Sequence, residues 1–262
     1  MKNQLPFENK IVLVTGSGRG IGREIGLHFA RLGADVVINF FRNRAPAEST
    51  AIEVEKLGRR ALVVKADMGN LDDISRLFDE IVSTFGGLDI FVHNAASGYN
   101  RSVMEQKPRG WDWTMNINAR ALLFAAQRAA PLMEKRGGGS IISISSPGAN
   151  YVLPEYVVVG ASKAALEALT RYLAVEFAPM NIVVNAVSPG VVETDALKHF
   201  DIIREEEDII GKAVKATPVG RLATPRDVAE VVAFLASPSA AMICGQVITI
   251  DGGYLLAMKN RE

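Results

Sequence analysis

The chain has 262 residues, of which 48% are hydrophobic, so it can bury a large core, and α/β chains of this length commonly form one domain. Basic and acidic residues both number 29, which leaves no net positive field to attract nucleic acid or an anionic membrane. The only cysteine, Cys244, has no partner for an internal disulfide and no nearby histidine with which to share a metal. The first residues lack the apolar run of a signal peptide. We therefore expect a single domain over residues 1–262, cytoplasmic and without a metal.

Patterns typical of strands and helices alternate along the chain. Strands are expected at Lys10–Thr15, Asp35–Asn39, Ala61–Ala66, Leu88–His93, Gly137–Ser145, Asn181–Val187 and Gln246–Asp251. Helices are expected at Ile21–Leu32, Ala47–Leu57, Leu71–Phe85, Trp111–Arg136 and Glu155–Phe177. This order predicts a Rossmann-type, doubly wound parallel sheet of about seven strands with helices on both faces. A ligand then binds beyond the carboxyl ends of the strands.

Residues 195–218 break the alternation. The stretch is acidic at its centre, Arg204–Asp208, and apolar residues flank this centre on both sides. Segments of this length between regular elements are often functional, so we expect a substrate lid here. The alternative is a pair of ordinary surface helices.

A glycine-rich segment, TGSGRGIG (Thr15–Gly22), joins the first expected strand to the first expected helix. Glycine allows a ligand to approach the backbone closely, and the start of a helix presents unpaired N–H groups that attract anions. This position in the chain is the one that the dinucleotide-binding motif requires. We therefore expect a pyrophosphate to bind at Gly16, Ser17, Arg19, Gly20, Ile21 and Gly22.

The end of the second strand indicates which dinucleotide is preferred. An NAD site typically has a carboxylate there for the ribose 2′-hydroxyl, but this chain has Asn39–Arg44, with no acidic residue. Arg42, together with Arg19 in the glycine loop, is suited to neutralising a 2′-phosphate. The sequence thus favours NADPH/NADP⁺ as the cofactor.

Together these residues resemble the short-chain dehydrogenase/reductase family over essentially the whole chain. The resemblance rests on TGSGRGIG, on HNAA (His93–Ala96), on a strand bearing serines, on a helix carrying Lys163, and on SPG (Ser188–Gly190) followed by Thr194. The family's usual motif at the second of these places is NNAG, so His93 and Ala96 depart from it. We interpret His93 as a packing substitution.

The resemblance implies roles for several further residues. It implies that Asp67 and Met68 face the adenine, that Asn94 lines the cofactor, and that Thr194 contacts the nicotinamide carboxamide. It also implies that Ser146 bonds a substrate oxygen, with Ser143 and Ser145 as neighbouring serines. The backbone carbonyl of Asn118 corresponds to the one that anchors a proton-relay water near Lys163, and Asn116 is the nearby alternative.

The tyrosine of the catalytic helix stands at an unusual spacing. Most of the family has tyrosine four residues before the lysine, but Val159 occupies that position and Tyr156 stands seven before Lys163. In a helix, spacings of four and of seven both return to about the same face, so Tyr156 is expected one turn farther along. Tyr-x6-Lys is the pattern of the third, NADPH-dependent type of bacterial enoyl-acyl-carrier-protein reductase. WDWTMNINARALLFAAQ and SKAALEALTRYLAVE resemble that type as well.

This likeness implies reduction of trans-2-enoyl thioesters carried by acyl carrier protein or CoA in fatty-acid synthesis. Tyr156 then stabilises the enolate, while Lys163 binds the nicotinamide ribose and makes the phenol more acidic. Tyr151 is the rival donor, although we expect it to line the acyl pocket. The family resemblance also implies a homotetramer assembled through the two long helices.

Two other functions are compatible with the same motifs. The first is a carbonyl or alcohol dehydrogenase for a ketoacyl, sugar or small ketone substrate, which the tyrosine spacing disfavours. The second is a non-catalytic dinucleotide sensor or scaffold, which is expected to lose the Tyr156/Lys163 pair while keeping the glycines.

Overall fold

The computed structural model describes residues 5–193 and 209–258. A seven-stranded sheet, in the order β3-β2-β1-β4-β5-β6-β7, crosses the molecule, and all its strand pairs are parallel. The strands are β1 (Ile11–Val14), β2 (Asp35–Phe40), β3 (Ala61–Lys65), β4 (Ile90–His93), β5 (Gly139–Ile144), β6 (Ile182–Pro189) and β7 (Val247–Ile250). Seven expected strands are therefore confirmed, with shifts of one or two residues at their ends.

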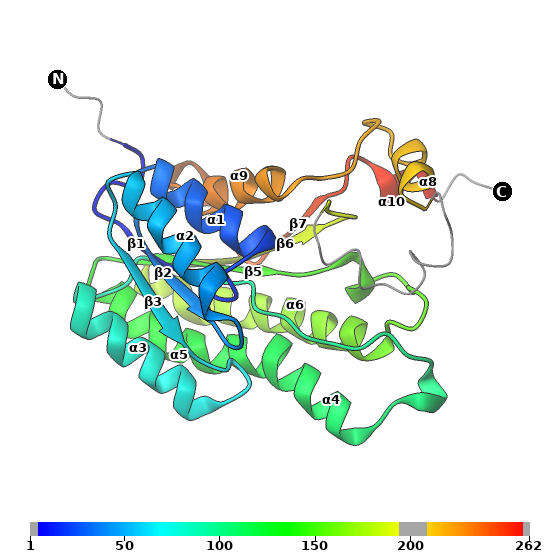
Figure 1. Cartoon of the computed structure of the whole chain (residues 1–262), viewed down its shortest axis with the longest axis horizontal. Coiled ribbons are helices and arrows are strands. Elements are labelled where there is room, and N and C mark those ends of the chain that lie inside the picture. The colour runs from blue at the N-terminus through cyan, green and yellow to red at the C-terminus, as the bar shows by residue number, and fades with distance from the viewer. Residues whose placement is uncertain (1–4, 194–208, 259–262) are drawn as a thin grey trace.

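Helices cover both faces of the sheet (Figure 1). On one face lie α1 (Gly20–Arg31), α2 (Arg44–Lys56) and α9 (Pro225–Leu235), and on the other lie α3 (Leu71–Phe85), α5 (Ala121–Glu134) and α6 (Val157–Phe177). Three shorter α-helices also lie within the described residues: α4 (Pro108–Met115), α8 (Ile209–Ala216) and α10 (Tyr254–Met258). Alternate residues of each central strand pack into opposite cores, because successive strand side chains point to opposite faces.

Two expected helices differ from the observed ones. The expected helix Trp111–Arg136 is interrupted by one π-helical turn at Asn116–Arg120, which separates α4 from α5. The expected helix Glu155–Phe177 begins only at Val157, with Tyr156 as its N-cap residue. Glu155 has a left-handed φ of 57°, so the chain turns sharply just before the helix. Tyr156 therefore belongs to a turn, which corrects the expectation that it lies on the helix itself.

Helix α9 was missed by the sequence patterns. It begins with a reciprocal capping box between Thr224 and Asp227, and Pro225 occupies its first turn. Both are signals that sequence analysis can recognise, because each satisfies or removes an N–H group that has no partner inside the helix. Of the expected lid, residues 195–208 lie outside the described residues, and the remainder begins with α8.

Candidate active site

The expected site residues that the structure describes gather at the carboxyl edge of the sheet. Strands β1 and β4 are neighbours there, and the chain leaves them toward opposite faces of the sheet. A crevice forms at such a topological switch point because the connections diverge. The glycine loop follows β1, Asn94 follows β4, and Ser146 follows β5.

The glycine loop is packed too closely to accept side chains at key positions. Gly16 has a left-handed φ of 64°, and a Cβ atom at Gly22 would lie 2.6 Å from the Gly16 carbonyl oxygen. Asn94 supports the same turn, because its Nδ2 donates to the Thr15 carbonyl at 2.8 Å. The amide N–H of Gly16 is held by Oδ1 of Asn39 at 3.2 Å. The loop is thus held in shape by β2 and by the end of β4.

The start of α1 fits the pyrophosphate of a dinucleotide. The N-cap residue Arg19 makes no side-chain capping bond, and the first turn contains no acidic residue. The N–H groups of that turn therefore lack an internal partner, and the positive end of the helix dipole is not neutralised. Ser17 differs from the expectation, because its buried hydroxyl donates to the Val14 carbonyl at 2.7 Å. Its backbone N–H donates to the Asn39 carbonyl at 3.0 Å, so both donor groups of Ser17 already have partners within the protein.

The two arginines expected to select the cofactor are both exposed. Within the described residues neither Arg19 nor Arg42 makes an ion pair, whereas the neighbouring Arg44 is paired with Glu48 at 2.6 Å. The guanidinium of Arg42 lies over the ring of Phe41, 5.8 Å from its centroid. Both cations are therefore available to an anionic ligand.

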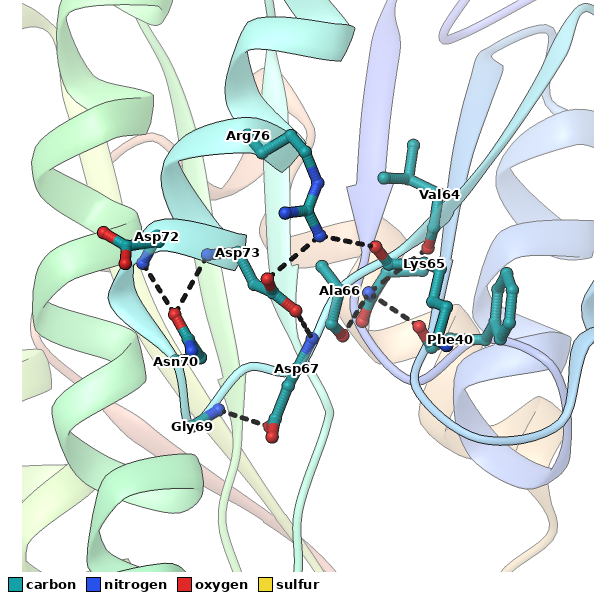
Figure 2. Close-up of polar contacts among 11 residues, drawn as sticks. Phe40, Val64, Lys65, Ala66, Asp67, Gly69, Asn70, Asp72, Asp73 and Arg76 are labelled. Carbon is teal, nitrogen blue, oxygen red and sulfur yellow. Dashed lines mark hydrogen bonds and ion pairs between the residues drawn. The ribbon is translucent and has the colours of Figure 1, made fainter.

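The segment expected to face the adenine lies after β3 (Figure 2). The carboxylate of Asp67 accepts the Gly69 N–H at 2.8 Å, and the backbone N–H of Asp67 donates to Asp73 at 2.8 Å. Met68 is buried in the core behind this turn. These bonds hold the turn rigidly next to the end of β2.

Tyr156 and Ser146 come together at the end of β5. The phenol hydroxyl donates to Ser146 Oγ at 3.4 Å, which is longer than an ordinary O–H···O bond and leaves the proton available to a better acceptor. Burial raises the pKa of Tyr156, and the hydrogen bond with Ser146 opposes this only in part. Lys163 does not acidify this phenol in the described structure, which corrects the expectation from sequence. Tyr156 is thus a neutral hydrogen-bond donor.

Lys163 is buried on the face of α6 that packs against the sheet. Its Nζ donates to the carbonyl of Ile144, the last residue of β5, at 2.7 Å. Burial lowers its pKa to about 8, and the nearby Glu167 carboxylate opposes this shift. Tyr156 and Lys163 therefore bind positions only two residues apart at the end of one strand.

Asn118 lies inside the π-helical turn, and all its polar atoms have partners. Its side chain accepts the Ser97 N–H at 2.9 Å and donates to Ser162 Oγ at 2.9 Å. Its carbonyl oxygen, where a relay water was expected, lies 3.2 Å from Nε2 of the buried His93. Burial and the Lys163 charge lower the pKa of His93 to about 4, so the imidazole is neutral at physiological pH. His93 thus takes part in the site's hydrogen bonding, beyond the packing role expected from sequence.

A cavity of about 420 Å³ opens beside the phenol. It is lined by Tyr156, Gly148, Val103, Ala161 and Tyr151. Most of the lining side chains are apolar. The space therefore suits an aliphatic or aromatic group attached to a polar reacting centre.

One expected site residue lies outside the part of the chain that the structure describes. Thr194 is outside the described residues. Among those described, no group of three metal-binding side chains occurs, and no helix combines the length and apolar character needed to cross a bilayer.

Sequence reasoning missed Glu167, which stands one turn after Lys163 and is buried. Only the spacing of four residues between them hinted at a shared face.

Comparison with known proteins gives consistent matches over nearly the whole chain. A family model described as enoyl-(acyl carrier protein) reductase matches residues 16–255. A 1-cyclohexenylcarbonyl-CoA reductase of Streptomyces collinus is 36% identical over 96% of this chain and 89% of its own length. A hydroxynaphthalene reductase-like protein, Arp2, of Metarhizium robertsii is 40% identical over 93% of this chain and 94% of its own.

A solved structure of similar fold carries a nicotinamide cofactor. It is a 7α-hydroxysteroid dehydrogenase in complex with NADH and 7-oxo glycochenodeoxycholic acid. It superimposes with a TM-score of 0.90 at 34% sequence identity, covering 97% of both chains.

Proposed function

The chain belongs to the short-chain dehydrogenase/reductase family of oxidoreductases, and we propose that it reduces the carbon–carbon double bond of trans-2-enoyl thioesters with NADPH in fatty-acid synthesis. One observation carries the proposal: Tyr156 reaches Ser146 from seven residues before Lys163, while the position four residues before the lysine has no proton donor. The phenol is thereby the tyrosine hydroxyl that contacts Ser146.

Val159, at the nearer position, supports this assignment. Its side chain is buried, and a Cβ atom at Gly98 would collide with its Cγ2 methyl group. Val159 therefore fills space between α6 and the loop after β4. A packing side chain therefore occupies the position at which most of the family carries its proton donor. In this proposal Tyr156 is the donor.

The position of the phenol suits charge that develops away from the reacting carbon. When bound, NADPH supplies a hydride to the β-carbon of the enoyl group. Negative charge then gathers on the thioester oxygen, three bonds from that carbon, where the neutral Tyr156 hydroxyl donates a hydrogen bond. Ser146, which already contacts the phenol, bonds the same oxygen. Transfer of a proton from solvent water to the α-carbon completes the reduction.

Lys163 and the glycine loop hold the cofactor in this proposal. The ammonium group of Lys163 binds the hydroxyls of the nicotinamide ribose, and Asn118 keeps the loop after β4 against α6 through Ser97 and Ser162. Arg19 and Arg42 bind the 2′-phosphate, because both are exposed and free of ion pairs within the described residues. A relative is solved in complex with NADH, so family membership alone does not indicate whether a chain uses NADH or NADPH.

The relatives support two substrate classes. The name of the Streptomyces relative describes an unsaturated carbonyl thioester, the substrate class proposed here. The hydroxynaphthalene reductase-like relative and the 7-oxo ligand of the steroid enzyme favour carbonyl reduction as the second candidate. The contact between Ser146 and Tyr156 is compatible with both, since each reaction gathers charge on an oxygen.

We also propose a cytoplasmic homotetramer that acts on acyl-carrier-protein or CoA thioesters. Tyr172 and Val175 of α6 are 70% and 76% exposed, which gives this helix an apolar outer surface for contact with a second copy. Light scattering of the purified protein measures the number of subunits.

One assay decides between the candidate functions. NADPH oxidation is measured with crotonyl-CoA, acetoacetyl-CoA and a simple ketone at equal concentrations, and then with the corresponding acyl-carrier-protein thioesters. The proposal requires turnover of the crotonyl thioester to exceed that of the acetoacetyl thioester by at least tenfold. Preference for the acetoacetyl thioester or the ketone establishes the second candidate, and NADPH binding without turnover establishes a non-catalytic sensor.

A further inference from the structure

A row of buried polar contacts joins β5 to α6 below the active site. Lys163 binds the Ile144 carbonyl, and one turn farther along the helix Glu167 accepts a hydrogen bond from Ser145 Oγ at 2.6 Å. Nearly one turn beyond that, Thr170 bonds Ser143 at 3.1 Å. Ser143 on β5 and Ser145 directly after it are therefore paired with polar residues spaced along one face of α6.

Glu167 uses both carboxylate oxygens on one short segment. Oε1 binds Ser145, and Oε2 accepts from Nδ2 of Asn150 at 2.9 Å. Ser145 and Asn150 stand at the two ends of residues 146–149, the turn that contains Ser146 and the glycine against which Tyr156 packs. The Glu167 carboxylate therefore links the two ends of this turn.

The carboxylate is also the counter-charge of the buried lysine. Glu167 is 5% exposed and has no ion-pair partner within 4.0 Å among the described residues, so its hydrogen-bond partners are neutral. A buried charge is costly unless an opposite charge compensates it. Lys163, also 5% exposed, lies one turn away on the same face of α6.

Among the residues that the structure describes, no other charged group compensates the charge of Lys163. His93 on β4 is neutral at physiological pH, as is Tyr156. Asp112 on α4 is exposed, and the guanidinium of Arg120, on the π-helical turn, binds the Gly69 carbonyl at 2.6 Å. The charge that acts on Lys163 is therefore that of Glu167, which opposes the effect of burial on the pKa of this lysine.

We propose that Glu167 is a positioning residue of the active site, which holds the turn bearing Ser146 under the phenol and supplies the negative charge that keeps the buried Lys163 an ammonium. The proposal rests on the proposed function only for what Tyr156 and Lys163 do in the reaction. Its structural part concerns the cofactor-free protein and is tested there.

The charge is tested by NMR on protein labelled with ε-¹³C-lysine. The Lys163 resonance is assigned with Lys163→Met, and in the unaltered protein it titrates near pH 8. Glu167→Gln lowers this midpoint by at least one pH unit, a factor of about ten in the ratio of ammonium to amine. The control is Thr170→Val, which removes the next contact of the same row without changing charge and leaves the midpoint where it is. A Glu167→Gln midpoint within 0.3 units of the original overturns the proposal.

A second measurement covers the case in which Glu167→Gln does not fold. Lys163→Met, Glu167→Leu and the double variant are compared by urea unfolding. If the two charges compensate each other, the double variant is more stable than Glu167→Leu alone, because it leaves no buried ammonium without a counter-charge. A double variant no more stable than Glu167→Leu contradicts the proposal.

The contribution of the Glu167 hydrogen bonds to the turn at residues 146–149 is tested by measuring kcat. Asn150→Ala keeps both charges and removes one of the two bonds to the turn, so it lowers kcat at least threefold while the Lys163 midpoint stays unchanged. An unchanged kcat in an enzyme with measurable turnover contradicts this part. If the unaltered protein reduces no enoyl thioester, the proposed function fails, but the NMR and unfolding results still decide the role of the Glu167 charge.

Discussion

The ring of Tyr156 lies directly on the backbone of Gly148: a Cβ atom at Gly148 would be 2.5 Å from both Cδ1 and Cε1 of the ring. A Cβ atom at Gly160, one turn into α6, would in turn lie 2.6 Å from the Gly148 carbonyl oxygen. Two glycines thus allow the start of α6 to approach the turn after β5. This close approach is what brings a phenol from outside the helix to Ser146.

Gly148→Ala is therefore expected to displace the phenol while leaving the fold intact. The methyl group cannot share space with the ring, so Tyr156 must move away from Ser146 and kcat falls at least tenfold, with NADPH affinity changed less than twofold. Steady-state kinetics and cofactor fluorescence measure the two effects. The control is Gly110→Ala on α4, where a Cβ atom meets nothing within 4 Å, and activity is retained. Equal activity of the two variants would contradict the role of Gly148 in placing the phenol.

Tyr156→Phe removes the hydroxyl and keeps the ring on Gly148. Turnover of a crotonyl thioester is expected to fall at least tenfold, since loss of one donor to the developing oxyanion typically costs on the order of a hundredfold. NADPH binding is retained. Tyr151→Phe is the matched control, because that side chain also lines the cavity but makes no hydrogen bond with Ser146 in the described structure. A larger loss in Tyr151→Phe would make Tyr151 the donor.

Replacing Arg19 and Arg42 together by alanine is expected to weaken NADPH binding by about tenfold to a hundredfold. Each charge-assisted hydrogen bond to the 2′-phosphate contributes roughly 1.5–3 kcal/mol, and part of this is screened at exposed positions. The NADH dissociation constant, measured by fluorescence titration, stays the same because NADH has no 2′-phosphate. Arg44→Ala, whose guanidinium is already paired with Glu48, serves as the control and changes neither constant. Unchanged NADPH affinity in the double variant refutes the assignment.

The buried His93 is expected to make the protein sensitive to acid. Its pKa is about 4 in the folded protein and 6.5 in the unfolded chain, so the unfolded chain binds more protons between these values. Stability is then full above about pH 6.5 and decreases by roughly 3 kcal/mol as the pH falls to about 4.

The measurement is the slope of urea-unfolding free energy against pH. His93→Asn has no group that titrates in this window, and its slope is shallower than that of the unaltered protein. The pKa of His28 is also lowered, chiefly by burial, and this residue is present in both proteins, so the difference between the slopes isolates His93. Identical slopes would contradict a buried, neutral imidazole.

The order of the elements, and the position of the glycine loop between β1 and α1, followed from sequence patterns. Strand and helix periodicities, caps and glycines are local signals, each contained in a few neighbouring residues. Helix α3 is the clearest case: the sequence predicts Leu71–Phe85, and the structure has the same bounds, because Asn70 caps its start and Gly86 ends it in the left-handed conformation.

The arrangement inside the active site depended on contacts between distant segments. Tyr156 leaves the helix that its spacing to Lys163 suggested, because the turn at Glu155 and the contact with Gly148 override the helical period. His93 binds the Asn118 carbonyl, and Glu167 joins both ends of a turn on another element. Burial and hydrogen-bond partners are properties of the packed molecule. The chain alone therefore decided which residues meet at one edge of the sheet, and only tertiary packing decided their partners and their charges.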